Sequence, residues 1–157
     1  MKILYICTHN RCRSILSEAI TNANSEGLLI AKSAGSQPAG EVHPLSIQYL
    51  NQSGYPTHEL QSQSWDDFED FEPDVVITVC DSAAGEACPV YFGKSTKVHW
   101  GLSDPSKIQG SDDEKRQAFM SCIDEVVKRV DALKSLAKQE LENEELSAAL
   151  TKIGNQS

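Results

Sequence analysis

The chain alternates short apolar, β-prone runs with amphipathic segments, and this alternation constrains its fold more than any other feature. The four runs cover residues 2–6, 28–34, 74–80 and 95–100. Parallel strands need long crossover connections, which are usually helices that cover both faces of the sheet. We therefore expect an α/β fold, a three-layer sandwich with a four-stranded parallel sheet.

The segments between and after these runs carry the signals of helix ends. Proline in a first turn, glycine after a last turn, acidic residues at an N-terminus and a capping box each mark such an end. On these signals we expect helices over 14–26, 44–51, 64–71 and 111–138. In the last helix, helical spacing predicts a buried face of Phe119, Cys122, Ile123, Val126, Val130, Leu133 and Ala137.

The apolar pattern continues to Lys138 and then thins. We expect residues 1–138 to form one domain and residues 139–157 a C-terminal extension that is helical or loosely ordered. The formal net charge of -9 argues against a nucleic-acid partner. No apolar stretch approaches the ~18 residues that cross a membrane, and the N-terminus lacks a signal-peptide pattern. We expect a cytoplasmic protein whose five cysteines are reduced.

The stretch CTHNRCRS, residues 7–14, lies between the first expected strand and the first expected helix. Ligands of parallel sheets bind at the carboxyl ends of strands, so this turn lies where a site is expected. Its backbone N–H groups and the start of the helix would form a cradle for an anion. The expected oxyanion-binding residues are Thr8, His9, Asn10, Arg11, Cys12 and Arg13.

Three side chains of the turn suit covalent chemistry on an oxyanion. In the positive field of the cradle, Cys7 would have a lowered pKa and act as a nucleophile. Arg13 can donate two parallel hydrogen bonds to a tetrahedral oxyanion, and Ser14 can donate one to the thiolate. The alternative interpretation is purely structural, with Cys7 as a core residue, Arg13 as a surface cation and Ser14 as a helix cap.

CTHNRCRS resembles the phosphate-binding loop of the low-molecular-weight protein tyrosine phosphatases and of the arsenate reductases that share their fold. The likeness continues through SAG (33–35), DVVITVC (74–80), a cysteine followed by proline (88–89) and HWGLSDP (99–105), and covers most of residues 1–135. This resemblance implies a nucleophilic Cys7, an oxyanion clamp at Arg13 and a general acid at Asp104. The alternative function is a phosphatase that uses these same three residues.

Cys80 and Cys88 favour the reductase, because each thiol–disulfide step needs a new attacking sulfur. The resemblance implies that Cys7 attacks arsenate, Cys80 attacks Cys7 to release arsenite, and Cys88 carries the disulfide onward, for arsenic detoxification. Residual phosphatase activity would be expected beside it. Ser106 follows Asp104 and Pro105 at the position where the phosphatases usually have an aromatic residue that lines the substrate cleft, which counts against the phosphatase. A third hypothesis is a non-enzymatic redox or arsenic sensor.

The resemblance implies an external thiol reductant and no tightly bound cofactor. Thioredoxin and a glutathione and glutaredoxin system both stay open, because seven residues separate Cys80 from Cys88, one more than in thioredoxin-coupled reductases. Phosphate and sulfate are the expected analogues of arsenate. Asn10, Glu18 and Ser33 match positions that line a potassium site in some relatives. Gln63 stands where a carboxylate is expected, so we predict neither potassium nor another metal.

Overall fold

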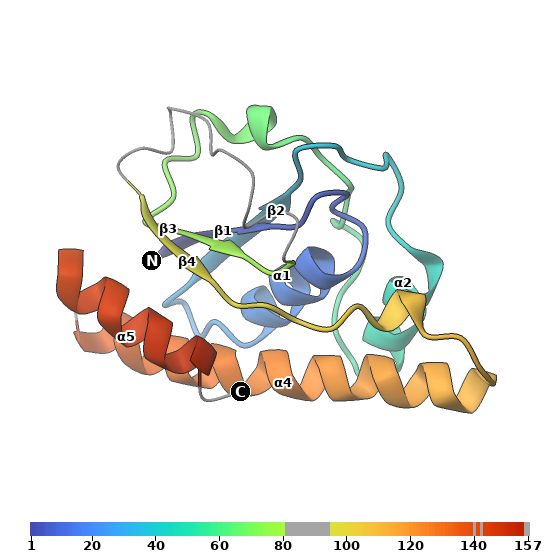
Figure 1. Cartoon of the computed structure of the whole chain (residues 1–157). Coiled ribbons are helices and arrows are strands. Elements are labelled where there is room, and N and C mark those ends of the chain that lie inside the picture. The colour runs from blue at the N-terminus through green and yellow to red at the C-terminus, as the bar shows by residue number, and fades with distance from the viewer. Residues whose placement is uncertain (81–94, 140, 142, 156–157) are drawn as a thin grey trace.

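The computed structural model describes residues 1–80, 95–139, 141 and 143–155 (Figure 1). Its four strands are β1 (Lys2–Ile6), β2 (Ile30–Ala34), β3 (Val75–Thr78) and β4 (Thr96–His99). All neighbouring strands pair in parallel, in the order β2-β1-β3-β4. The predicted four-stranded parallel sheet is confirmed.

The register brings the carboxyl ends of the strands level. Ile6, at the end of β1, pairs with Ala34 of β2 on one side and with Thr78 of β3 on the other, and Thr78 pairs in turn with His99 of β4. The segments that follow these four residues therefore leave the sheet side by side. They contain the turn at 7–14, Gly35, Cys80 and the 99–105 motif.

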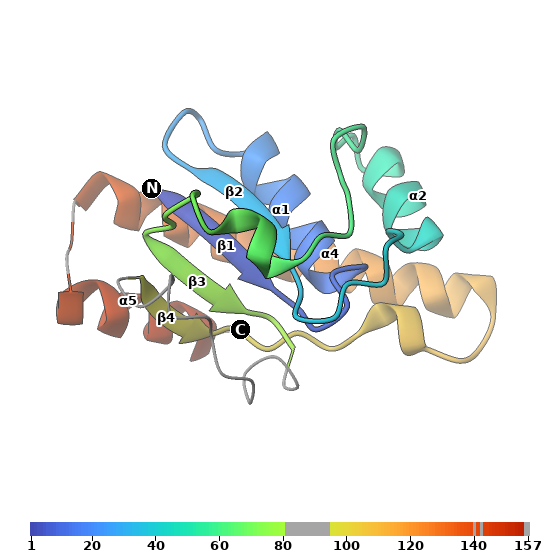
Figure 2. The ribbon, with the colours of Figure 1, turned by 90° about the horizontal axis from the view of Figure 1, so that it is seen from above.

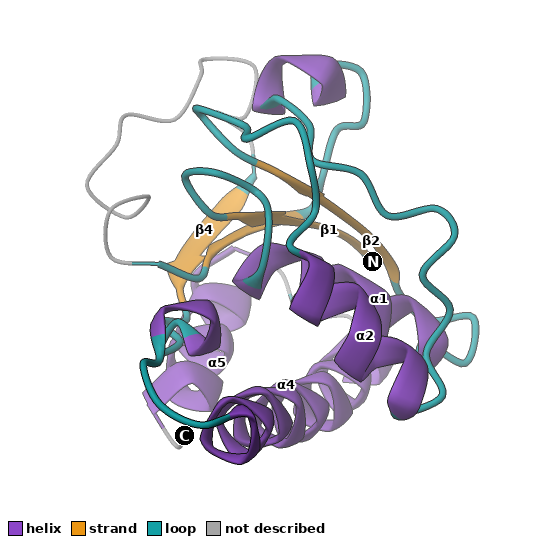
Figure 3. Cartoon of the chain, turned by 90° about the vertical axis from the view of Figure 1, so that its right-hand side faces the viewer, coloured by secondary structure: helices purple, strands orange, loops and turns teal. Residues whose placement is uncertain are grey.

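The α-helices are α1 (Arg13–Ala23), α2 (Pro44–Gln52), α4 (Asp112–Gln139) and α5 (Asn143–Asn155). Figure 3 shows them on one side of the sheet, with the short 3-10 helix η1 (Trp65–Phe68) on the opposite side. All residues of β3 and all but the first of β1 are buried. Both central strands are thus covered on both faces, as their continuous apolar runs predict.

Two helix boundaries differ from the expected ones. The segment 64–71 forms only η1, because its acidic residues favour an N-terminal turn but leave no basic residue for the C-terminal end. Helix α1 ends at Ala23 with Asn24 as its C-cap, so Gly27 lies in the following turn with a φ of 78° rather than capping the helix. The strand predicted over 28–34 begins at Ile30.

Helix α4 buries the predicted apolar face except Ala137, which is half-buried. It buries Arg129 and Leu136 in addition. Ser111 Oγ accepts a hydrogen bond of 3.2 Å from the Glu114 N–H, which confirms the expected cap. Helix α5 packs against β4 and α4 and buries Leu146 and Leu150 (Figure 2). Of the helices in the described ranges, none is long and apolar enough to cross a membrane.

Candidate active site at the β1–α1 turn

Asn10 orders the turn between β1 and α1 from inside. Its φ of 46° lies in the left-handed region, which asparagine tolerates better than most residues. The buried side chain donates from Nδ2 to Ser14 Oγ at 2.8 Å and accepts from the Gln63 N–H at 2.7 Å. Asn10 thus fixes the turn both to the start of α1 and to the segment between α2 and η1.

The chain after β2 holds the turn from outside. The carbonyls of Thr8 and His9 accept hydrogen bonds of 2.9 and 3.0 Å from the Gln37 and Ala39 N–H groups. A Cβ atom at Gly35 would lie 2.6 Å from the Cys7 carbonyl oxygen and closer still to that of Thr8. The N–H groups of Thr8 and His9 face the two sulfurs: that of Thr8 donates to Cys80 Sγ at 3.4 Å, and that of His9 bonds to the Cys7 sulfur. The Asn10 N–H donates to the Cys7 carbonyl at 3.2 Å. The turn therefore has the form of an anion cradle.

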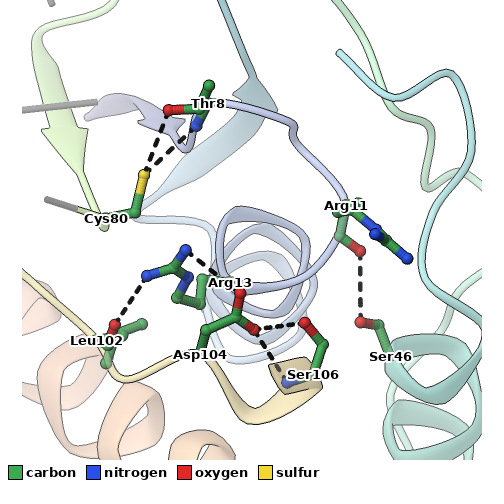
Figure 4. A network of polar contacts seen from close by, with 8 residues as sticks. All are labelled: Thr8, Arg11, Arg13, Ser46, Cys80, Leu102, Asp104 and Ser106. Carbon is green, nitrogen blue, oxygen red and sulfur yellow. Dashed lines mark hydrogen bonds and ion pairs between the residues drawn. The ribbon is translucent and has the colours of Figure 1, made fainter. Parts of the chain in front are cut away.

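Arg13 is held by the segment that follows β4. Its Nη1 donates to the Leu102 carbonyl at 3.1 Å, and its Nη2 lies 3.4 Å from Asp104 Oδ2 (Figure 4). Its Nε is buried and has no hydrogen-bond partner among the described residues. A buried N–H without a partner is costly, so this guanidinium is suited to bind an oxyanion through Nε.

Asp104 is fixed through its second oxygen. Oδ1 accepts from the Ser106 N–H at 2.9 Å and from Ser106 Oγ at 2.6 Å, while Pro105 begins the 3-10 helix η3 (Pro105–Lys107). This arrangement leaves Oδ2 directed toward Arg13 (Figure 4). A carboxyl group beside the cradle can donate a proton to an oxygen that leaves the bound anion.

A second thiol lies directly at the nucleophile position. Cys80 follows β3, and its Sγ accepts a hydrogen bond of 3.4 Å from the Thr8 N–H (Figure 4). The side chains of Cys80 and Cys7 are hydrogen-bonded to each other, and both are buried. Two sulfurs in hydrogen-bond contact can join as a disulfide with little movement.

The predicted lowering of the Cys7 pKa is wrong for this state of the protein. The pKa of Cys7 is raised, first by the hydrogen bond with Cys80 and next by burial, and Arg13 opposes both effects only in part. Two thiols in one buried site cannot both ionise readily, so ionisation is a property of the pair. In this state of the protein the positive field of the turn is therefore outweighed.

These features agree with the comparisons with known proteins. The sequence matches the family "Low molecular weight phosphotyrosine protein phosphatase" over residues 2–146. The chain belongs to this family. It is 33% identical to an arsenate reductase of Halalkalibacterium halodurans over 128 residues, which cover 82% of this chain and 91% of the relative. It is 30% identical to an arsenate reductase of Bacillus subtilis over 130 residues, 82% of this chain and 92% of the relative.

Solved structures of the family are also similar. A thioredoxin-dependent arsenate reductase of Corynebacterium glutamicum has a TM-score of 0.67 and 26% identity, covering 89% of this chain and 63% of that one. The structure titled "An arsenate reductase in oxidized state" has a TM-score of 0.70 over 87% of this chain and 98% of that one, at 22% identity. The second likeness supports the phosphatase-family fold.

The other predicted site residues have varied positions in this family member. Ser14 Oγ accepts from Asn10, so its role toward Cys7 stays a prediction. Cys12 is buried and hydrogen-bonded to Ser46, and burial raises the pKa of its thiol to about 11. His9 is exposed and its Nδ1 lies 3.0 Å from the Gln37 carbonyl oxygen. Cys88 lies outside the described residues.

The residues matching the potassium site of relatives are hydrogen-bonded within the protein, Asn10 to Ser14 and Gln63, and Ser33 to Glu18. The Ser33 hydroxyl donates to Glu18 Oε1 at 2.6 Å, and burial raises the pKa of this carboxyl group. The Glu18 Oε1 atom is thus already used by a hydrogen bond within the protein. In the described ranges, His, Cys, Asp and Glu side chains form no group of three that could hold a metal ion.

Three further residues shape the site: Gly35, Trp100 and Arg129. Gly35 and Trp100 lie in two of the motifs that carry the resemblance, but no structural role was predicted for them, and Arg129 was not identified from the sequence. Arg129 Nη1 donates to the Trp100 carbonyl at 2.9 Å, and Nη2 donates to that of Gly101 at 3.2 Å. A lone arginine on an otherwise apolar helix face is the one sequence signal that could have identified it.

Proposed function

We propose that this protein reduces arsenate to arsenite with Cys7 as nucleophile and an external dithiol as the source of electrons. The observation that carries the proposal is the position of Cys80, whose Sγ accepts from the Thr8 N–H at 3.4 Å and whose thiol is hydrogen-bonded with that of Cys7. A phosphatase needs no second thiol at its nucleophile, whereas a reductase needs one to complete its chemistry. The names of the two curated relatives support the same activity.

The first step joins arsenic to sulfur. Arsenate binds to the N–H groups of the turn and to Arg13, and the Cys7 sulfur attacks the arsenic atom. An As–S bond forms and an As–O bond breaks, and Asp104 protonates the oxygen that leaves as water. The proton of Cys7 passes to an oxygen of the bound arsenate as the sulfur attacks, so no free thiolate has to form despite the raised pKa of this thiol, and Arg13 stabilises the negative charge of the anion.

The second step moves two electrons. The Cys80 sulfur attacks the Cys7 sulfur, so that an S–S bond forms and the S–As bond breaks. The bonding electron pair stays on arsenic, which leaves as arsenite, and the two cysteines are oxidised. The hydrogen bond between the two thiols suits this step, because it holds the attacking sulfur beside its target.

Regeneration requires a further thiol. In our proposal Cys88 attacks Cys80, frees Cys7 and presents a Cys80–Cys88 disulfide to the external reductant. Thioredoxin is the first choice because one structural relative is described as thioredoxin-dependent. Glutathione with glutaredoxin is the second, and the assay below compares them.

The test is arsenate-dependent NADPH oxidation by the purified protein, with a thioredoxin system and with a glutathione and glutaredoxin system. We expect turnover in one system, and the active one identifies the reductant. Cys7→Ser should abolish turnover, and Cys80→Ser should lower it at least about 1000-fold, since each removes a sulfur that forms a bond. Silence of the wild type in both systems, with ready hydrolysis of an aryl phosphate, would favour the phosphatase.

Cys80→Ser is the variant that separates the two functions. It should spare any hydrolysis of p-nitrophenyl phosphate, because that reaction uses Cys7, Arg13 and Asp104 alone. Cys122→Ser is the matched control, since this buried α4 thiol lines the same pocket as Asp104 but has no part in the proposed relay, so its replacement should leave arsenate turnover intact. Equal loss of turnover in Cys80→Ser and Cys122→Ser would count against the relay.

A further inference from the structure

The C-terminal helix α5 is joined to the active site through Trp100. The Trp100 indole is buried, and its Nε1 donates to the Leu150 carbonyl of α5 at 2.8 Å. A Cβ atom at Gly154 would lie 2.6 Å from Cδ1 of the same indole. Two positions on α5 are thus fitted to this one side chain.

Trp100 is also held from α4. The Arg129 guanidinium donates to the carbonyls of Trp100 and Gly101, and it lies 5.8 Å from the indole ring centroid. Glu125 Oε1 lies 3.4 Å from Arg129 Nε and holds the guanidinium in turn. Side chain and carbonyl of Trp100 are therefore both fixed, by two different helices.

The constraint at Trp100 continues into the acid loop, which we define as residues 101–107. Leu102, two residues after Trp100, accepts from Arg13 Nη1 at 3.1 Å. Asp104 follows and lies 3.4 Å from Arg13 Nη2. A short backbone segment between two anchored ends has little freedom, so the position of Trp100 determines where the Asp104 carboxyl group lies.

We propose that α5, acting through Trp100, is a positioning element that places Asp104 for proton transfer. This inference rests on the proposed function, because it concerns the general acid of that reaction. Leu150 and Gly154 lie beyond residue 146, where the match to the family ends. The C-terminal segment thus contributes to catalysis although it supplies no group that touches the substrate.

Two variants break the contact from opposite sides. Trp100→Phe keeps an aromatic ring but removes the N–H that donates to Leu150. Gly154→Ala leaves Trp100 intact and adds a Cβ atom against the indole. Lys152→Ala is the control, because this residue lies on the exposed side of α5. Urea unfolding of each variant shows whether it is folded under the assay conditions.

The decisive measurement is a double-mutant cycle with Asp104→Asn. Trp100→Phe and Gly154→Ala should each lower kcat for arsenate about tenfold, with KM changed less than about twofold, because a misplaced acid slows the chemical step. In the Asp104→Asn background neither should lower kcat further by more than about twofold. Unchanged kcat, or equal falls in both backgrounds, would overturn the proposal.

A second readout does not depend on arsenate turnover. The Leu102 N–H bonds to the Val79 carbonyl at 3.0 Å, and the Ser106 N–H bonds to Asp104 Oδ1 at 2.9 Å. In folded Trp100→Phe, amide hydrogen exchange at these two positions should be about tenfold faster than in Lys152→Ala. Equal exchange would overturn the coupling even if the wild type reduced no arsenate, so the two proposals fail separately.

Discussion

At the scale of single residues, the site depends on two sulfurs that share one buried space. The Cys7–Cys80 hydrogen bond has the largest effect in raising the pKa of Cys7, ahead of burial. The positive field of the turn and Arg13 pull in the opposite direction. The resting protein therefore favours protonated Cys7, and the thiol has to give up its proton as it attacks the bound anion.

Replacing the second sulfur should make the first more acidic. Cys80→Ser removes the largest effect that raises the Cys7 pKa, so the midpoint for alkylation of Cys7 by iodoacetamide should move down by at least about one pH unit. Mass spectrometry of the Cys7 peptide across pH measures this midpoint. Cys12→Ser is the control, since it removes a thiol that is hydrogen-bonded to Ser46 and not to Cys7. An unchanged midpoint in Cys80→Ser would contradict the shared-proton account.

At the scale of elements, the turn is held by the end of β2 as much as by its own residues. Gly35 has no room for a Cβ atom, because the Cys7 and Thr8 carbonyls occupy that space. The SAG motif could be recognised in the sequence, but its close approach to the turn could not. That approach follows from the pairing of Ile6 with Ala34, which no local pattern contains.

Gly35→Ala should move the turn and lower kcat/KM for arsenate at least about 100-fold, because oxyanion contacts tolerate little displacement. Ser36→Ala, at the next position in the chain, is the matched control. The Ser36 hydroxyl is buried without a hydrogen-bond partner among the described residues, so its removal should leave activity intact and stability equal or higher. Steady-state kinetics and urea unfolding measure both. Similar kcat/KM for Gly35→Ala and Ser36→Ala would refute this role.

The elements also show where sequence patterns were sufficient. The apolar runs predicted all four strands, since buried parallel strands have a composition of their own. The segment 64–71 was predicted as a helix on local charge alone, and the structure has only η1. Trp100 and Arg129 lie 29 residues apart in sequence, so their contact required the segment after β4 to pass beside α4.

At the scale of the whole molecule, one phenol and two thiols are buried in their neutral form. Burial raises the pKa of Tyr5 and of Cys122 to about 12 and that of Cys12 to about 11. In the unfolded chain these groups titrate at their ordinary values, near 9 for a thiol. The unfolded state therefore loses protons first as the pH rises, and this favours unfolding.

The free energy of unfolding should thus be largest below about pH 8.5 and fall as the pH rises past it toward 11. Each buried thiol adds a slope of up to about 1.4 kcal/mol per pH unit. Urea unfolding at pH 7, 8, 9 and 10, with a phosphine reductant, measures the trend. Cys122→Ala should be less stable at pH 7 by about 1 kcal/mol but show a shallower slope. A flat or rising profile in the wild type would contradict the assigned burial.

The parallel sheet and the β1–α1 turn could be predicted because the patterns that mark them lie in contiguous residues. The Arg13–Asp104 pair and the docking of α5 depend on side chains brought together from distant parts of the chain. The sequence marked residues 139–157 only by a thinning apolar pattern. That Leu146 and Leu150 are buried depends on the surfaces of α4 and β4 that receive them.

The central claim is that arsenate oxidises Cys7 and Cys80 as a pair. The most direct measurement treats reduced Cys88→Ser protein with one equivalent of arsenate, without external reductant, and maps disulfides by peptide mass spectrometry. The account predicts one arsenite released per chain and a Cys7–Cys80 disulfide, because the relay stops where Cys88 is missing. Free thiols with no arsenite, or a disulfide that joins Cys7 to Cys12 instead, would contradict it.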